Sequence, residues 1–278
     1  MDHIGPYRLL KLIRAGAKTH VWEAMDPADN KRIAIKALQP DHCQDKHEIA
    51  TLRHEYTVGH TLEHKYVNSV REYNVHRDIP YVVMDYFAAP NLKQAIRESP
   101  KLCREHFPEI LKQCALSLGH VHEKGWIHRD IKPDNYLMDA EANVRLIDFA
   151  IAIKVKKKPS GIGKMFASKS AIMGTRSYMS PEQIRGDHLD PSADIYSLGC
   201  VLFELLAARP PYTGSSADEL LKKHLRAPIP VLTSIDSQVT DSFSKLITKM
   251  LAKKPEHRPQ SIKQVVKAAN KIRIFSIA

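Results

Sequence analysis

Two carboxylates and one amide are spaced along the chain in a way that suits the handling of a phosphate. Asp130 and Asn135 stand in the segment WIHRDIKPDN, and Asp148 stands further on, directly before a phenylalanine. One β-rich stretch follows Asn135 and another ends at Asp148, so these polar side chains should lie at the ends of a hairpin. One acid there can orient a hydroxyl and accept its proton, while the other acid and the amide hold Mg²⁺ between phosphate oxygens. An ordinary loop could contain any one of these residues, but their joint occurrence predicts phosphoryl transfer.

The elements that must position these residues divide the chain into a strand-rich first part and a helical second part. Apolar residues recur at strand or helix spacing between turn residues. They predict strands at Tyr7–Ile13, Val21–Met25, Arg32–Leu38, Val67–His76 and Tyr81–Asp85, and helices at Asp45–Thr61, Phe107–Lys124, Ala193–Ala208, Ser237–Leu251 and Gln260–Ile272. The change from strands to helices comes near Asp85–Pro90. A cleft between two such parts is the expected ligand site.

Composition narrows the function classes further. The four cysteines are scattered and form no C-x-x-C pair, which favours reduced, buried thiols over a zinc or redox site. His60 and His64 have the i,i+4 spacing of zinc ligands on a helix, but the H-E-x-x-H pattern is absent, so we do not expect a metal there. The formal charge of +11 attracts phosphates, acidic proteins or anionic membranes. The sequence contains no run of 18 apolar residues, so it predicts no membrane span.

The segment HRDIKPDN and the later Asp148-Phe149 pair resemble the catalytic and metal-binding loops of protein kinases. Further motifs of that family follow in order: IAIK ending at Lys36, Glu55 on the next helix, SPE ending at Glu182, DIYSLG from Asp194, and Arg258 in HRP. The resemblance covers roughly residues 7 to 270. The segments GTRSYMSPEQ and LAKKP are similar to those of the bacterial, eukaryotic-like serine/threonine kinases.

The resemblance implies an α+β, two-lobed protein-kinase-like fold. A small N-lobe (residues 1–85), with an antiparallel sheet and one main helix, would be joined by a hinge (86–90) to a larger helical C-lobe (91–278). It also implies a function, the transfer of the γ-phosphate of ATP to Ser or Thr hydroxyls of protein substrates, with Mg²⁺. We expect no nucleic acid as a partner. We expect a cytoplasmic protein, or the cytosolic kinase domain of a longer, membrane-anchored one.

The same resemblance assigns roles residue by residue. Asp130 would orient the acceptor hydroxyl, Lys132 would sit near the γ-phosphate, and Thr175 would bridge the two, as in serine/threonine kinases. Lys36 would bind the α- and β-phosphates and be held by Glu55. Asn135 and Asp148 would ligate Mg²⁺. The nucleotide would contact Ile13, Gly16, Val21, Ala34, Lys36, Met84 as the gatekeeper, Asp85, Phe87 and Leu137.

Three departures from the family pattern support an alternative, a pseudokinase scaffold that binds nucleotide weakly or not at all. Arg14 and Thr19 replace two glycines of the phosphate-binding loop and leave Gly16, which should weaken nucleotide affinity. Ala150 replaces the glycine after Asp148-Phe149, and its Cβ should limit a backbone flip there. Gly59 stands one turn after Glu55, where the family packs a large apolar residue. We expect it to leave that contact unfilled and the helix mobile.

The segment 150–179 predicts a mode of control. It carries Lys154, Lys156, Lys157, Lys158, Lys164 and Lys169, and no acid occurs between Asp148 and Glu182. Arg129, directly before Asp130, could pair with a phosphate in this loop. We therefore expect autophosphorylation of Ser168 and Ser170, which could involve dimerisation and trans-phosphorylation. The lysines could also recruit an acidic partner or an anionic membrane surface, or be no more than a solvated run.

Overall fold

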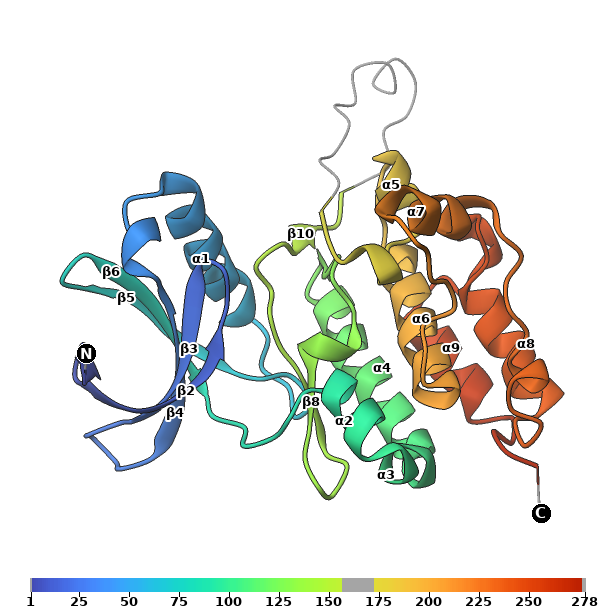
Figure 1. Ribbon diagram of the computed structural model, residues 1–278, viewed down its shortest axis with the longest axis horizontal. Helices are drawn as coiled ribbons and strands as arrows, with labels where there is room; N and C mark the ends of the chain where they lie inside the picture. Colours follow the sequence, from blue (N-terminus) through green and yellow to red (C-terminus); the bar gives the residue numbers. More distant parts are fainter. Residues whose placement is uncertain (1, 157–172, 277–278) are drawn as a thin grey trace. The chain divides into compact units, whose positions relative to one another are not determined.

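The computed structural model describes residues 2–156 and 173–276 (Figure 1). The chain divides into two compact units. Unit 1 comprises Met1–Ala89 and Ile147–Ile151, and unit 2 comprises Pro90–Leu146 and Ala152–Ala278. The break after Ala89 falls within the segment where the sequence predicts a hinge. The return of Ile147–Ile151 to unit 1 was not predicted.

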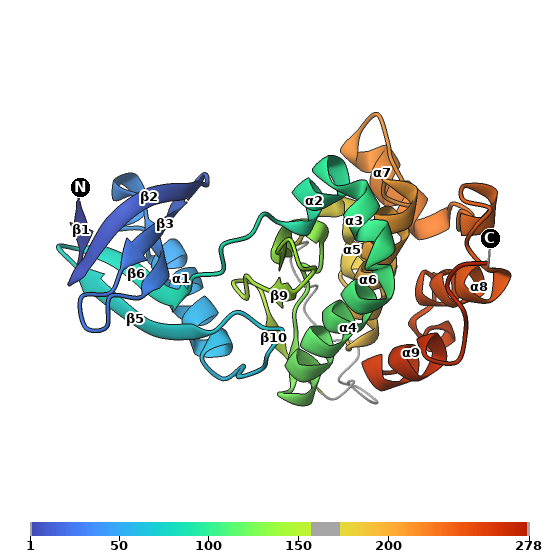
Figure 2. The same ribbon diagram turned by 90° about the horizontal axis from the view of Figure 1, so that it is seen from below.

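Unit 1 is a six-stranded antiparallel sheet with one long helix. The strand order is β1-β2-β3-β4-β6-β5, with bounds β1 His3–Ile4, β2 Tyr7–Ala15, β3 Thr19–Met25, β4 Arg32–Leu38, β5 Val70–His76 and β6 Ile79–Asp85. Helix α1 (Lys46–Gly59) packs against β4, β5 and β6 (Figure 2). It begins at Asp45, whose carboxylate accepts hydrogen bonds from the backbone N–H groups of His47 and Glu48 and so caps the first turn. The predicted antiparallel sheet with one main helix is confirmed.

The two faces of this sheet carry different side chains: one is apolar and buried, and the other carries Lys36. Ile33, Ile35 and Ala37 on β4 lie in a buried apolar cluster with Tyr81 and Val83 of β6. Ala34 and Lys36 alternate with them and so point to the other face. The register puts Val21 beside Lys36 and Met84 beside Ala34 on that face.

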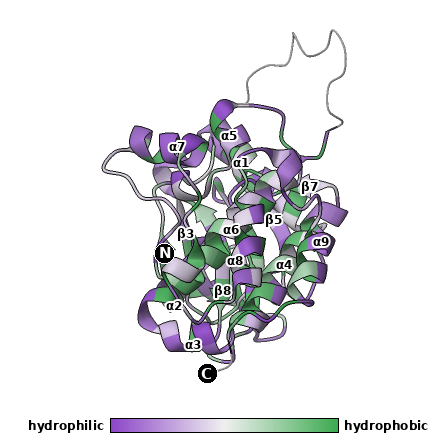
Figure 3. Ribbon diagram, turned by 90° about the vertical axis from the view of Figure 1, so that its right-hand side faces the viewer, coloured by the Kyte–Doolittle hydropathy of each residue, from purple (hydrophilic) through white to green (hydrophobic). Residues whose placement is uncertain are grey.

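Unit 2 is mainly helical. Its helices are α2 Leu92–Glu98, α3 Pro100–Glu105, α4 Phe107–Glu123, α5 Pro181–Arg185, α6 Ser192–Ala207, α7 Ala217–Arg226, α8 Asp241–Met250 and α9 Ile262–Ala269. Helix α6 is buried from Ser192 to Leu205 and packs against α4 and α8, so it is the centre of the unit. Figure 3 shows mostly hydrophilic residues on α7. The predicted helical lobe is confirmed, although α2, α3, α5 and α7 were not individually predicted.

Short strands of unit 2 carry the loops of interest. β8 (Tyr136–Met138) and β9 (Val144–Leu146) form the predicted hairpin, and β7 (Trp126–Ile127) pairs with β10 (Ile153–Lys154).

The structure describes only part of the predicted basic loop. Lys157, Lys158, Lys164, Lys169, Ser168 and Ser170 lie outside the described residues, so the predicted phosphorylation sites and most of the basic loop stay predictions. Within the described ranges, no helix is long and apolar enough to cross a bilayer.

Candidate active site

Unit 1 contains a buried ion pair that the sequence predicts. Lys36, on β4, donates to Oε2 of Glu55, on α1, at 2.6 Å. The Nζ of Lys36 also lies 3.6 Å from Oδ1 of Asp148, which belongs to the short segment that returns to this unit. The structure therefore brings together three of the predicted site residues, from a strand, a helix and a loop.

Burial and charge compete in this cluster. Burial disfavours the ammonium of Lys36, but the nearby carboxylates of Asp148 and Glu55 outweigh it, so the pKa of Lys36 is raised and the side chain stays cationic. Burial also raises the pKa of Glu55, against the attraction of Lys36. The cluster thus holds a desolvated ammonium on Lys36, which is suited to the phosphates of a nucleotide.

Unit 2 contains a second cluster, centred on the carboxylate of Asp130. Its Oδ1 accepts hydrogen bonds from the backbone N–H (2.8 Å) and the hydroxyl (2.9 Å) of Thr175. Its Oδ2 accepts from Nζ of Lys132 at 2.6 Å and from Nδ2 of Asn135 at 3.2 Å. The Nζ of Lys132 also donates to the Thr175 hydroxyl at 2.8 Å. Thr175 therefore bridges Asp130 and Lys132 in the predicted way.

The amide of Asn135 fits a metal ligand. Its Nδ2 donates to the backbone carbonyl of Asp130 at 2.9 Å, which directs Oδ1 away from that loop. The side chain is fully buried, and Oδ1 has no hydrogen-bond partner among the described residues. A buried carbonyl oxygen without a donor costs free energy unless a cation or another donor reaches it. Asn135 thus suits the hard oxygen ligation that Mg²⁺ prefers.

The backbone of both predicted loops is held in an unusual conformation. Arg129 and Asp148 have φ values of 70° and 68°, in the left-handed region that residues with a Cβ seldom adopt. Ala150 is not among the residues with positive φ, so its Cβ causes no such strain in this conformation.

Side chains from α5 and α6, in the same unit, hold the strained turn at Arg129 by hydrogen bonds. Buried Asp194, in the first turn of α6, accepts the backbone N–H groups of His128 and Arg129, both at 2.8 Å. Burial would raise the pKa of Asp194, but its hydrogen bond with Nε2 of His122 and its other contacts lower it instead. Gln183 on α5 donates to the carbonyl of Arg129 at 2.9 Å. Sequence reasoning singled out neither His122 nor Gln183 for this support, because neither belongs to the segment that they hold.

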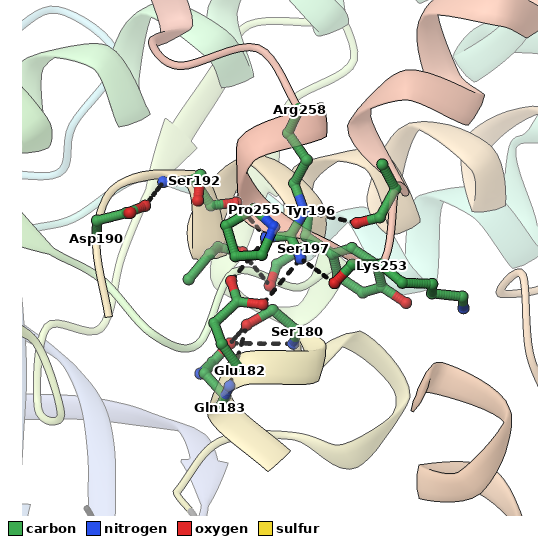
Figure 4. A network of polar contacts seen from close by, with 12 residues as sticks. Ser180, Glu182, Gln183, Asp190, Ser192, Tyr196, Ser197, Lys253, Pro255 and Arg258 are labelled. Carbon is green, nitrogen blue, oxygen red and sulfur yellow. Dashed lines mark hydrogen bonds and ion pairs between the residues drawn. The ribbon is translucent and has the colours of Figure 1, made fainter. Parts of the chain in front are cut away.

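A further buried ion pair joins α5 to the loop before α9. The guanidinium of Arg258 binds both carboxylate oxygens of Glu182, at 2.6 and 2.8 Å, and also donates to the carbonyl of Ser192. Figure 4 shows these two side chains pointing toward each other, with Tyr196 beside them. Arg258 lies over the Tyr196 ring, 4.9 Å from its centroid. The predicted pairing of Arg258 with Glu182 is present in the structure.

The predicted nucleotide contacts are distributed over both units. Val21, Ala34 and Met84 share the Lys36 face of the sheet. Ile13 does not pair with β3, because it lies between the partnered residues Leu12 and Arg14 at an irregularity, and it is 47% exposed. Asp85 and Phe87 belong to unit 1, where Phe87 accepts a hydrogen bond from the N–H of Ala89. Leu137, on β8, belongs to unit 2. No bound nucleotide tests these contacts, so they stay predictions.

The expectation about Gly59 is wrong. We expected this glycine to leave a packing position empty, but a Cβ built on it would lie 2.4 Å from Cγ2 and 2.9 Å from Cβ of Val70, and 3.3 Å from Cδ2 of Phe149. The side chain of Val70, on the adjacent strand β5, already occupies the space. Glycine is therefore needed for close approach, and the helix end is packed.

Comparison with known proteins agrees with this geometry. The family model described as "Protein kinase domain" matches residues 7–269. The serine/threonine-protein kinase PrkC of Bacillus subtilis is 34% identical over 254 residues, which is 91% of this chain and 38% of the relative. The serine/threonine-protein kinases PknB and PknA of Mycobacterium tuberculosis are each 31% identical over 92% of this chain, covering 41% and 59% of those proteins. The chain thus spans about two to three fifths of the length of these relatives. The chain belongs to the protein kinase domain family.

Proposed function

We propose that this chain is an ATP-dependent serine/threonine protein kinase. The observation that carries the proposal is the hydrogen-bonded cluster of Asp130, Lys132, Thr175 and Asn135. Its acid, lysine and amide are the groups that orienting a hydroxyl, neutralising a phosphate and holding Mg²⁺ require. The relatives named above as serine/threonine-protein kinases support the same acceptor class, as does the threonine that links Asp130 to Lys132.

Each residue has a distinct task in this proposal. Asp130, oriented by four hydrogen bonds, receives the proton of a Ser or Thr hydroxyl and aims its oxygen at the γ-phosphate. Lys132 neutralises the charge that develops on that phosphate. Lys36, kept cationic by Asp148 and Glu55, holds the other phosphates. Lys36 and Asp148 belong to unit 1 and the Asp130 cluster belongs to unit 2, so transfer requires residues of both units.

Mg²⁺ would neutralise and bridge the phosphate oxygens when bound. Asn135 offers the buried Oδ1 described above, and Asp148 offers a partly exposed carboxylate beside Lys36.

The decisive test compares the wild-type protein with Asp130→Asn and Lys36→Met after incubation with Mg-ATP and a generic protein substrate. Phosphate incorporation is measured, and the modified residues are mapped by mass spectrometry. Wild type should modify Ser or Thr, while both variants should lose nearly all activity, because positioning and charge neutralisation supply most of the catalysis. The matched control is Asp139→Asn. This residue shapes the β8–β9 turn through its Oδ1, which the amide retains. Equal incorporation by wild type and Asp130→Asn would favour the pseudokinase alternative.

The finer predictions about partners rest on the same proposal. Protein substrates with Ser or Thr acceptors follow from the proposed activity. Binding of the lysine-rich loop to an acidic partner or an anionic membrane, dimerisation for trans-autophosphorylation and cytoplasmic location stay proposals without a structural test.

A further inference from the structure

Arg14, which stands where the family has the first glycine of its phosphate-binding loop, lies in one cross-strand row with the phosphate-binding lysine. The register pairs Arg14 of β2 with Val21 of β3, and Val21 with Lys36 of β4. Directly paired residues of antiparallel strands point to the same face of a sheet. Arg14 therefore faces the same side as Lys36, with one strand between them, or about 10 Å from backbone to backbone.

The charge of Arg14 is available to a ligand. Arg14 is exposed, and no carboxylate among the described residues lies within ion-pair distance of it. Lys18, in the loop that follows β2, is already paired with Glu48. Arg14 and Lys36 thus place two positive charges on one face of the sheet, where like charges repel each other. An anion between them would relieve this repulsion.

Hydrogen bonds within the protein already use several backbone groups of the loop between β2 and β3. The N–H of Gly16 donates to the carbonyl of Thr19 at 2.9 Å, which closes the turn. The side chain of Gln39 donates to the carbonyl of Gly16 at 2.5 Å, and its N–H donates to the carbonyl of Lys18. The turn is thus fixed by internal bonds, and with Arg14 and Thr19 it lacks two of the glycines that allow close approach of a phosphate to the backbone.

We propose that Arg14 binds the phosphates of the nucleotide together with Lys36, so that a side-chain cation replaces the contacts of a glycine-rich loop. This inference rests on the proposed function, because it concerns the same nucleotide. A guanidinium is well suited to the task, since it binds two phosphate oxygens at once and is always charged. The sequence alone predicts that the loss of glycine at position 14 weakens nucleotide binding. The sheet register instead favours a role for the Arg14 side chain that compensates for this loss.

The test measures binding of Mg-ATP, Mg-ADP and adenosine by calorimetry. Arg14→Ala and Arg14→Gly should weaken binding of both phosphate-bearing ligands by about tenfold or more, the worth of a charge-assisted hydrogen bond. Adenosine affinity should not change, which also shows that the sheet is intact. Arg14→Lys should lie between the wild type and Arg14→Ala. The matched control is Arg8→Ala, which removes the same charge from β2 where the strand pairs with Met25, four rows away from Lys36.

The possible outcomes separate this inference from the proposed function. If wild type binds Mg-ATP and Arg14→Ala binds it equally well or more tightly, the role of Arg14 is refuted while the kinase proposal stands. The role is also refuted if Arg14→Ala loses adenosine and ATP in the same proportion, or if Arg8→Ala has the same effect. If the wild type binds no nucleotide, both proposals fail.

Discussion

The contact between Gly59 and Val70 allows a sharp test of packing in unit 1. Replacing a helical glycine by alanine normally stabilises a protein by up to about 1 kcal/mol, because alanine has the better helix propensity. At Gly59 we expect the opposite sign. The new methyl group would lie 2.4 Å from Cγ2 and 2.9 Å from Cβ of Val70. Rotation of the valine can move Cγ2, but Cβ is fixed to the backbone, so the helix or the strand must shift.

The magnitude follows from these opposing effects. Overpacking a close contact costs about 1–3 kcal/mol, and the propensity gain offsets about 1 kcal/mol of it. Gly59→Ala should therefore lower the free energy of unfolding by up to about 2 kcal/mol. Shortening the opposing side chain in the double variant Gly59→Ala/Val70→Ala removes the contact with Cγ2, which is the shorter of the two, and leaves the contact with Cβ. The double variant should thus lose less stability than the sum of the two single variants, by about 1–2 kcal/mol.

Urea unfolding of the wild type, both single variants and the double variant measures this coupling. The matched control is Gly119→Ala in α4. It gains the same helix propensity, but its Cβ would meet only the Ile262 side chain, at 3.1 and 3.5 Å. Stabilisation of the protein by Gly59→Ala, or additive effects in the double variant, would refute the argument for size matching at this position.

Two further predictions concern buried charges of unit 2. His224 is fully buried, with Tyr196 hydrogen-bonded to its Nδ1 at 2.9 Å, and burial, with repulsion from Lys253, lowers its pKa to about 4. The unfolded chain binds a proton near pH 6.5 and the folded chain only near pH 4, so this residue should lower the free energy of unfolding by up to about 3 kcal/mol as the pH falls through that window. The wild type should show this steeper loss in urea titrations, and His224→Gln should not; parallel pH profiles would contradict the assignment. Glu182→Gln leaves the Arg258 guanidinium buried without its carboxylate and should cost about 3–5 kcal/mol. The exposed-pair control Asp187→Asn should cost at most about 1 kcal/mol, and equal effects of the two variants would rule out a special contribution of the buried pair.

The sequence allowed accurate prediction wherever local pattern decides structure. Strand β4 was predicted at its observed bounds, Arg32–Leu38, because its apolar residues are bounded by turn residues. Helix α7 was missed, since its ten residues are mostly polar and only its cap, Ser216, marks its start. The packing at Gly59 could not be predicted either. It depends on Val70, from another element, and no local pattern reveals which side chain fills a space.

The same limit applies to the site. Motif order located Asp130 and Asn135, because their chemistry demands those residue types close together in sequence. The alignment of Arg14 with Lys36 depends instead on strand register and on an irregularity near Ile13, which shifts the partners of β2. A one-residue slip would have turned Arg14 to the opposite face.

The hydrogen bonds of Asp194 link the catalytic loop to the least exposed helix of unit 2. Two consecutive amides of a strained turn end on one buried carboxylate in the first turn of α6. For these amides to exchange with solvent, the turn must release Asp194, which would leave its buried carboxylate with His122 in place of three partners. Local opening is therefore far less favourable here than in an ordinary surface loop, and the turn belongs to the same cooperative folding unit as α6. The stability of the turn therefore depends on the packing of α6, so a substitution deep in α6 can disable the loop without altering any residue in it.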